Sequence, residues 1–260
     1  MDNEAVLARY DQELRREAES DGPGAVVERT GSVVRQDGGE LGWSAVLWSG
    51  LDEAGADAAI AEQVRWFAAQ GREFEWKHYS HDRPADLPER LLAAGFTAEP
   101  SETLMVAEAA GQTAEVALPD GVRLRTATDE EGVRQLSEVH RAAFGEHADR
   151  FEAQLLAQLA ESPGTLTVVL AMAGGRAVGG ARMETLPGVS FAGLWGGGTL
   201  PEWRGKGLYR ALVAERARAA VARGYRYLQV DALPTSRPIL ERLGFTALTT
   251  TTPFTWSPGA

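Results

Sequence analysis

The chain has 260 residues, of which 44% are hydrophobic and 24% are charged, and it contains no cysteine. This length allows one large domain or two of ordinary size, and the composition excludes a disordered or fibrous protein. The lack of cysteine excludes disulfides, thiolate nucleophiles and thiolate metal ligands. The N-terminal segment has no apolar core of a secretory signal, and no stretch has the pattern of a membrane-spanning helix. We therefore expect a cytoplasmic protein that does not bind membranes.

The charge is distributed unevenly along the chain. The formal net charge of -11 disfavours binding to nucleic acid, whose phosphates require clustered Lys and Arg. Residues 1–118 carry 10 basic and 23 acidic side chains, whereas residues 119–260 carry 16 and 14. Any polyanionic ligand is therefore expected in the second half.

The first half of the sequence alternates between helical and strand-like patterns. We expect an extended stretch over 25–35 that ends in a hairpin turn at Asp37-Gly38-Gly39. The segment 108–119 is poor in aromatic residues and ends at a turn, so we place the linker there. The other expected elements are helices over 4–19, 52–70 and 87–94 and strands over 41–48 and 74–79.

The second half shows a similar order of patterns. Expected helices cover 130–144, 151–160, 208–223 and 239–243. Expected strands cover 122–125, 166–173, 177–186, 189–199 and 227–232.

Two segments of the chain resemble one another. The first segment runs from Phe67–Gly71 through a strand and a helix to Ala94-Gly-Phe-Thr-Ala98. The second runs in the same order from Val221–Gly224 through a strand and a helix to Leu243-Gly-Phe-Thr-Ala247. Because the order of elements is shared as well as the letters, we infer a tandem of two related α/β domains. Only the second copy has a glycine-rich basic loop before its long helix.

That loop carries the clearest ligand-binding pattern. It leads from an apolar strand into a helix, and its two glycines and three basic side chains are Arg204, Gly205, Lys206, Gly207 and Arg210. Glycine permits positive φ angles and close approach of the backbone, so successive N–H groups can converge on one anion. The helix N-terminus adds a partial positive charge. The pattern indicates a pyrophosphate site.

Other phosphate-binding motifs fail at defined positions. A Walker loop ending in Gly205-Lys206 needs glycine at position 200 and Ser or Thr at 207, where the chain has Leu200 and Gly207. A GxGxxG motif starting at Gly205 meets Arg210 in place of its last glycine. A solvated turn with incidental arginines is the alternative. The strand before the loop and the helix after it favour the pyrophosphate site.

Arg204-Gly-Lys-Gly207-Leu-Tyr209 resembles the signature of the GNAT superfamily of acyl-CoA-dependent N-acyltransferases, which reads Arg or Gln, two residues, Gly, one residue, Gly or Ala. Tyr209 departs from it, because a small residue is usual there. In element order the resemblance covers residues 120–256, and the first half is similar to the degenerate copy of tandem members. It implies an α/β (α+β) fold of two domains, 1–112 and 119–260, each with a mixed, mainly antiparallel sheet flanked by helices.

By this resemblance, the second domain binds acetyl-CoA as a co-substrate and uses no metal. The backbone of Gly197, Gly198 and Thr199 would run alongside the pantetheine arm, since glycines leave the strand's hydrogen-bonding groups free for a ligand. A bulged strand end is the alternative interpretation. The residues expected at the pyrophosphate are Arg204, Gly205, Lys206, Gly207, Leu208, Tyr209 and Arg210.

Acyl transfer requires a neutral amine, stabilisation of the oxyanion and a proton for the departing thiolate. Where the family often has a proton-donating Tyr this chain has Leu240, and where an Asn is often seen it has Leu233. The candidate catalytic residues are Glu184, Ser236 and Asp231. The alternatives are a solvent-facing strand position, a helix N-cap and a turn residue, respectively.

Several other residues are weaker candidates. His78, His81 and Asp82 lack a distant further ligand for a metal. His140 and His147 have a same-face helical spacing, for which a solvated or capping role is expected. The segment 144–151 is expected to border the acceptor cleft, with a plain surface loop as the alternative. The tryptophans at 43, 48, 66 and 76 are expected in the core.

The sequence thus predicts an enzyme that transfers acetyl from acetyl-CoA to a primary amine of a small molecule by direct attack on the thioester. The acidic first half favours a cationic acceptor. A non-catalytic acyl-CoA sensor and a scaffold module are the alternatives, the former because the proton-donating Tyr is missing. The acceptor, the acyl chain and the oligomeric state remain open.

Overall fold

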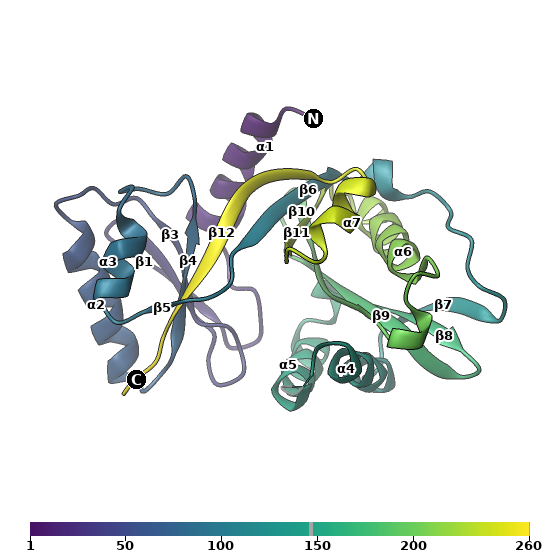
Figure 1. Cartoon of the computed structure of the whole chain (residues 1–260). Coiled ribbons are helices and arrows are strands. Elements are labelled where there is room, and N and C mark those ends of the chain that lie inside the picture. Colours follow the sequence, from purple (N-terminus) through teal and green to yellow (C-terminus); the bar gives the residue numbers. More distant parts are fainter. Residues whose placement is uncertain (146–147, 260) are drawn as a thin grey trace. The chain divides into compact units, whose positions relative to one another are not determined.

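The computed structural model describes residues 1–145 and 148–259 (Figure 1). The chain forms two compact units. Unit 1 contains Met1–Met105, Asp231–Ile239 and Ala247–Ala260, and unit 2 contains Val106–Val230 and Leu240–Thr246. Among the described residues, no helix has the length and apolar character needed to cross a membrane.

The units differ from the expected ranges 1–112 and 119–260 near the C-terminus. The final strand, β12 (Thr246–Trp256), pairs antiparallel with β4 (Phe74–Tyr79) along the whole length of β4. This pairing joins residues far apart in sequence, so local periodicity does not reveal it. The assignment of the two ranges as a degenerate domain and a catalytic domain stays a prediction.

Unit 1 is built on one mixed sheet. Its strands follow the order β1-β2-β3-β4-β12-β6, with β5 paired to β12. The pair β3–β4 is parallel, and β1–β2, β2–β3 and β4–β12 are antiparallel. The remaining bounds are α1 (Asn3–Tyr10), which continues as a π-helix over Asp11–Arg16, β1 (Val26–Thr30), β2 (Val33–Asp37), β3 (Ala45–Ser49), α2 (Ala56–Ala69), α3 (Leu87–Ala93), β5 (Thr97–Ala98) and β6 (Glu102–Glu108), which crosses the unit boundary.

Helices α2 and α3 cover one face of this sheet (Figure 1). On β4 the alternate residues Phe74 and Trp76 point to these helices and pack against Phe67 and Leu91. Phe67 stacks on Phe74 with ring centroids 4.1 Å apart. Strand alternation therefore sends the intervening residues of β4 to the opposite face.

One expectation for unit 1 was wrong. The stretch 25–35 is not a single extended segment but a hairpin of β1 and β2, with Thr30 paired to Val33. Gly31 has φ +58°, which supplies the left-handed conformation that a two-residue hairpin turn requires. The turn expected at Asp37-Gly38-Gly39 lies between β2 and β3, which do pair antiparallel.

Unit 2 also has mixed parallel and antiparallel strand pairing. Its strand order is β6-β11-β10-β9-β8-β7, with β10–β11 parallel and β9–β10, β8–β9 and β7–β8 antiparallel. The elements are β7 (Val122–Ala127), α4 (Glu130–Phe144), α5 (Ala148–Glu161), β8 (Leu166–Ala173), β9 (Arg176–Thr185), β10 (Phe191–Thr199), α6 (Leu208–Ala222), β11 (Tyr227–Ala232) and α7 (Arg237–Arg242). Short 3-10 turns cover Ala109–Gln112, Pro163–Thr165 and Pro201–Trp203.

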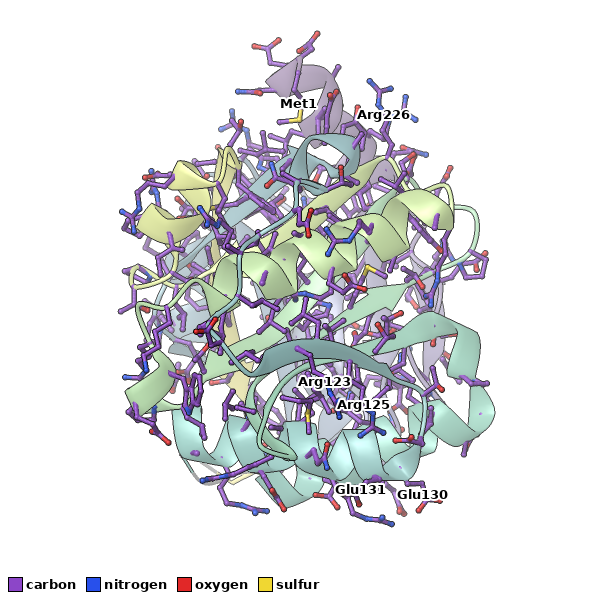
Figure 2. The ribbon with its side chains drawn as sticks, turned by 90° about the vertical axis from the view of Figure 1, so that its right-hand side faces the viewer. Met1, Arg123, Arg125, Glu130, Glu131 and Arg226 are labelled. Carbon is purple, nitrogen blue, oxygen red and sulfur yellow. The ribbon has the colours of Figure 1, made fainter. Side chains whose placement is uncertain are left out.

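Both faces of the unit 2 sheet are covered by helices (Figure 2). On β8, Val168 and Leu170 pack against α4 and α5, whereas Val169 packs against Leu212 of α6. The strand is apolar at nearly every position because it is buried on both sides.

The start of α4 is fixed by charge and by capping, and Figure 2 labels Arg125, Glu130 and Glu131 in this region. Asp129 is its N-cap and accepts a 2.7 Å hydrogen bond from the Gly132 amide. Arg125 on β7 binds the same carboxylate at 2.8 Å, while Glu130 and Glu131 occupy the first turn, where the helix dipole favours acids.

The inferred internal repeat is confirmed. Unit 1 contains a parallel strand pair, β3 and β4, joined through α2, and unit 2 contains the pair β10 and β11 joined through α6. In each copy a short helix and a Gly-Phe step follow the second strand, at Gly95-Phe96 and Gly244-Phe245. The order of elements that the sequence predicted therefore occurs twice in the structure.

Candidate active site

Two neighbouring strands of unit 2 separate part-way along their length. The parallel pairing of β10 with β11 begins at Phe191↔Tyr227 and ends at Gly193↔Gln229, although β10 continues to Thr199. Within the part of the chain that the structure describes, β10 therefore does not pair with β11 beyond Gly193. This leaves main-chain groups of β10 available to a ligand.

Strand β10 is also bulged in this region. Its pairing with β9 runs to Trp195↔Arg182, shifts register and resumes at Gly198↔Gly180, so two residues of β10 oppose one of β9. Gly196, within the bulge, has φ +58°, a conformation that other residues rarely adopt. The bulged strand end that the sequence left as an alternative is present, and bulges are common beside active sites.

The missing side chain of Gly197 makes room for the ring of Tyr209. A Cβ atom at position 197 would lie 2.9 Å from Cε2 of Tyr209 and 3.9 Å from Nη2 of Arg216. The aromatic ring where the GNAT signature has a small residue is thus accommodated by a glycine on the facing strand. Burial raises the pKa of the Tyr209 phenol, and Arg216 opposes this.

The loop before α6 has the backbone conformation that the sequence predicted. Gly205 has φ +72°, and Gly207 has φ +82° at the N-cap position, where no side chain caps the helix. Arg204, Lys206 and Arg210 are exposed, and none of them forms an ion pair with a described residue. Free amides and uncompensated positive charge therefore meet at one helix N-terminus, a combination suited to an anion.

A polar group lies on the opposite face of the sheet, beside α4 and α5. Arg182 forms an ion pair with Glu184 at 2.6 Å, and its guanidinium lies 5.0 Å from the ring centroid of Phe151. His140 stacks on Phe151 at 4.3 Å. Burial, and then the positive charge of Arg182, lowers the pKa of His140, so this imidazole is neutral at neutral pH.

The segment 144–151 was expected to border the acceptor cleft. Its last residue, Phe151, contacts His140 and Arg182. Residues 146–147, and with them His147, lie outside the described residues. Arg182 was not among the residues predicted from the sequence, and His140 was expected to have a solvated or capping role.

The candidate catalytic residues are divided between the units. Glu184 and the loop residues belong to unit 2, whereas Asp231 and Ser236 belong to unit 1. The hydroxyl of Ser236 donates to the Leu233 carbonyl at 3.1 Å. Asp231 is not a turn residue, because it lies within β11 and forms an ion pair with Lys77.

Asp231 is part of a charged cluster in unit 1 with Glu75, Lys77 and Glu102. Burial disfavours the charge on Lys77, but Asp231, Tyr79 and Glu75 together more than offset it, and the pKa of the ammonium lies well above its ordinary value. Burial raises the pKa of Glu75, which accepts a 3.0 Å hydrogen bond from the Trp43 indole. Burial and then the charge of Asp231 raise the pKa of Glu102 to about 7. The single positive charge of Lys77 therefore compensates the charges of these three carboxyl groups only in part.

This charge imbalance predicts a pH-dependent stability. An unfolded Glu ionises near 4.5, whereas folded Glu102 ionises near 7, so the folded state binds more protons between these values and loses stability as the pH rises through them. We expect Glu102→Gln to reduce this loss. Melting temperatures near pH 5.5 and pH 8 measure it, with Glu108→Gln, an exposed site on the same strand, as the control. Equal pH dependence in wild type and Glu102→Gln would contradict the assignment.

The residues weighed for a metal have protein partners. Asp82 accepts two hydrogen bonds from Arg15, at 2.7 and 2.8 Å, and His81 lies 2.8 Å from a carboxylate oxygen of Asp11. Within the described part of the chain, no group of three His, Asp or Glu side chains could hold a metal ion.

The tryptophans expected in the core differ in burial. Trp76 is fully buried. Trp66 is partly buried and packs against the hydrophobic core that contains Trp76. The guanidinium carbon of Arg35 lies 3.8 Å from the centroid of the Trp66 ring. Trp43 and Trp48 are only partly buried.

The comparisons with known proteins agree with this architecture. The model of the acetyltransferase (GNAT) family matches residues 133–245. A GCN5-related N-acetyltransferase from Kribbella flavida is 19% identical with a TM-score of 0.69, over 99% of this chain and 95% of that chain. A tandem GNAT protein from the clavulanic acid biosynthesis pathway is 18% identical with a TM-score of 0.64, over 93% of this chain and 86% of that chain.

A functionally unknown conserved protein from Staphylococcus epidermidis is 13% identical with a TM-score of 0.69, over 94% of this chain and 97% of that chain. No curated protein matches the chain significantly. The likeness to a tandem GNAT structure over nearly the whole chain confirms the predicted fold, while the family model matches the C-terminal half.

Proposed function

We propose that unit 2 transfers an acetyl group from acetyl-CoA to a primary amine of a small molecule, because the model of the acetyltransferase (GNAT) family matches residues 133–245. The observation that carries this proposal is the loop at Gly205–Gly207. It combines positive-φ glycines, an uncapped helix N-terminus and three cations without an acidic partner among the described residues. These are the groups that a pyrophosphate needs.

The residues of the site fit coenzyme A in two places. Arg204, Lys206 and Arg210 and the amides at the start of α6 hold the pyrophosphate. The backbone of Gly198 and Thr199, where β10 has left β11, hydrogen-bonds the pantetheine arm. Gly197 contributes backbone only, since Tyr209 covers the position of its missing side chain.

The reaction joins the amine nitrogen to the acetyl carbon and breaks the bond from that carbon to sulfur. A backbone N–H near Thr199 stabilises the oxyanion, in keeping with the free main-chain groups of β10. Glu184 takes up the proton that the amine nitrogen loses. It lies on the face that carries Arg182, with which it forms an ion pair, and it pairs in register with Gly193 of β10.

Asp231 and Ser236 remain candidate catalytic residues. The replacement of the expected donor by Leu240, which is fully buried, favours one alternative function, a sensor that binds acyl-CoA without turnover.

The test is calorimetric titration of acetyl-CoA, followed by detection of free CoA with a panel of small primary amines. We expect saturable binding at one site and CoA release with at least one amine. Binding without release on any amine supports the sensor. Absence of binding, together with no thermal stabilisation by CoA, contradicts the proposal and supports the scaffold.

A further inference from the structure

Acetyl transfer leaves a thiolate that must acquire a proton, and the chain lacks the expected donor. Leu240 on α7 is fully buried and has no ionisable atom. A donor for this step must lie in unit 2 near the segment of β10 assigned above to the pantetheine arm. It must also have a hydroxyl or another acidic group that the fold has not already engaged.

Tyr209 meets these conditions. It lies in the first turn of α6, two residues after Gly207, and its ring rests against the backbone of Gly197. The residue is only partly buried, and its hydroxyl makes no hydrogen bond with any described residue. By contrast, the hydroxyl of Tyr225, another half-buried tyrosine of unit 2, donates to the Leu186 carbonyl at 2.9 Å.

A buried positive charge lies beside Tyr209. Arg216 is on the same face of α6, two helical turns later, and is 1% exposed. Its guanidinium donates to the carbonyls of Leu212 at 3.0 Å and Arg182 at 2.9 Å, and it has no carboxylate partner within the described residues. Burial, opposed by Tyr209 and reinforced by Arg182, lowers the pKa of this guanidinium to about 10.

A cation buried without a counter-ion is costly, and the fold offers it one titratable neighbour that could become negative. The Tyr209 ring and Nη2 of Arg216 lie within 4 Å of the same point above Gly197. The electrostatically balanced state of the pair is the one in which the phenol has lost its proton. That state arises when the phenol has just protonated a leaving group, so the pair favours donation at that moment.

We propose that Tyr209 is the proton donor for the thiolate leaving group and that Arg216 stabilises the phenolate that remains. This rests on the function proposed above. As the carbon–sulfur bond breaks, its electron pair goes to sulfur, and the phenol proton moves to sulfur to give the free thiol. The proton released by the amine passes through Glu184 to solvent, and solvent returns a proton to the phenolate, so no other reactant is consumed.

Tyr209→Phe tests the assignment, because it keeps the ring against Gly197 and removes only the hydroxyl. With an amine that the wild type acetylates, we expect kcat to fall about 100-fold. The KM and the calorimetric Kd for acetyl-CoA should stay within about twofold of wild type. Tyr225→Phe is the matched control and should retain the wild-type kcat.

Arg216→Met supplies a measurement that a purely structural role would not reproduce. Methionine fills a similar buried volume without charge, and such replacements are often tolerated. We expect a lower kcat, and the double variant with Tyr209→Phe should be no slower than Tyr209→Phe alone, because Arg216 acts through the phenolate. If Arg216→Met does not fold, the assignment of Tyr209 is decided by whether Tyr209→Phe lowers kcat while leaving KM unchanged.

Three results would overturn the assignment. A wild-type kcat in Tyr209→Phe, or independent multiplicative effects of the two substitutions, excludes Tyr209 as the donor while leaving the transferase function intact. Loss of acetyl-CoA binding by Tyr209→Phe assigns the residue to the pyrophosphate site instead. No CoA release by the wild type on any amine overturns the proposed function and this inference together.

Discussion

Gly207→Val is expected to reduce the affinity for acetyl-CoA by about 100-fold or more, which corresponds to about 2.7 kcal/mol of binding free energy. Gly207 has φ +82°, a conformation that costs a non-glycine residue about 1–2 kcal/mol and that a β-branched residue rarely adopts. Valine would therefore force the loop to change shape. The amides at the start of α6 would then no longer converge with Lys206 and Arg210 on one anion.

A control at the other end of the same helix separates binding from stability. Gly224 follows α6, has φ +86° and has no atom within 4 Å of an added Cβ. Gly224→Val should thus lower the melting temperature by a few degrees, as Gly207→Val does, yet leave the calorimetric affinity for acetyl-CoA unchanged. Unaltered affinity in Gly207→Val, or equal loss in both variants, would refute the anion site at the loop.

Local patterns predicted much of the fold because the elements of unit 2 are bounded by strong signals. Strand β8 begins and ends at the predicted residues, since an apolar run buried on both faces is followed by the two glycines 174 and 175. Helix α4 was also predicted with its observed bounds, because Asp129 caps its start and Gly145, at φ +93°, ends it. These signals lie within a few residues of each boundary.

The candidate site was less predictable because its main features arise from contacts between distant segments. The sequence marked Tyr209 as a departure from a motif, but not that Gly197 compensates for it. Nothing in the helical pattern of α6 distinguishes the buried Arg216 from its exposed neighbour Arg218, since both precede an alanine. Such pairings depend on register and helix rotation, which local periodicity does not fix.

The same limitation applies to Asp231, whose partner Lys77 lies 154 positions away in the sequence. A single acidic residue at a strand end has the same local appearance whether it caps a turn, acts in catalysis or neutralises a buried lysine. Its side chain is 2% exposed and that of Lys77 is 13% exposed. The ion pair therefore makes a structural contribution that is separate from any part Asp231 plays in the reaction.

That contribution is expected to be large. Lys77→Met should destabilise the protein by about 3–5 kcal/mol near pH 8, because removing one partner of a buried pair leaves the other charge uncompensated. Here the loss is aggravated by the carboxyl groups of Glu75 and Glu102, which interact electrostatically with Lys77 and Asp231. Urea unfolding followed by circular dichroism and tryptophan fluorescence measures the change.

Two further variants identify the cause as charge. Lys77→Met combined with Asp231→Leu should recover more than half of the lost stability, since both members of the pair are then apolar. Arg90→Met removes a cation whose partners Asp57 and Asp86 are 75% and 52% exposed, and it should leave the unfolding curve unchanged. The penalty of Lys77→Met should also shrink near pH 5, where Glu102 is protonated. A penalty that persists unchanged at that pH, or in the double variant, would indicate lost packing of the lysine stem instead of unbalanced charge.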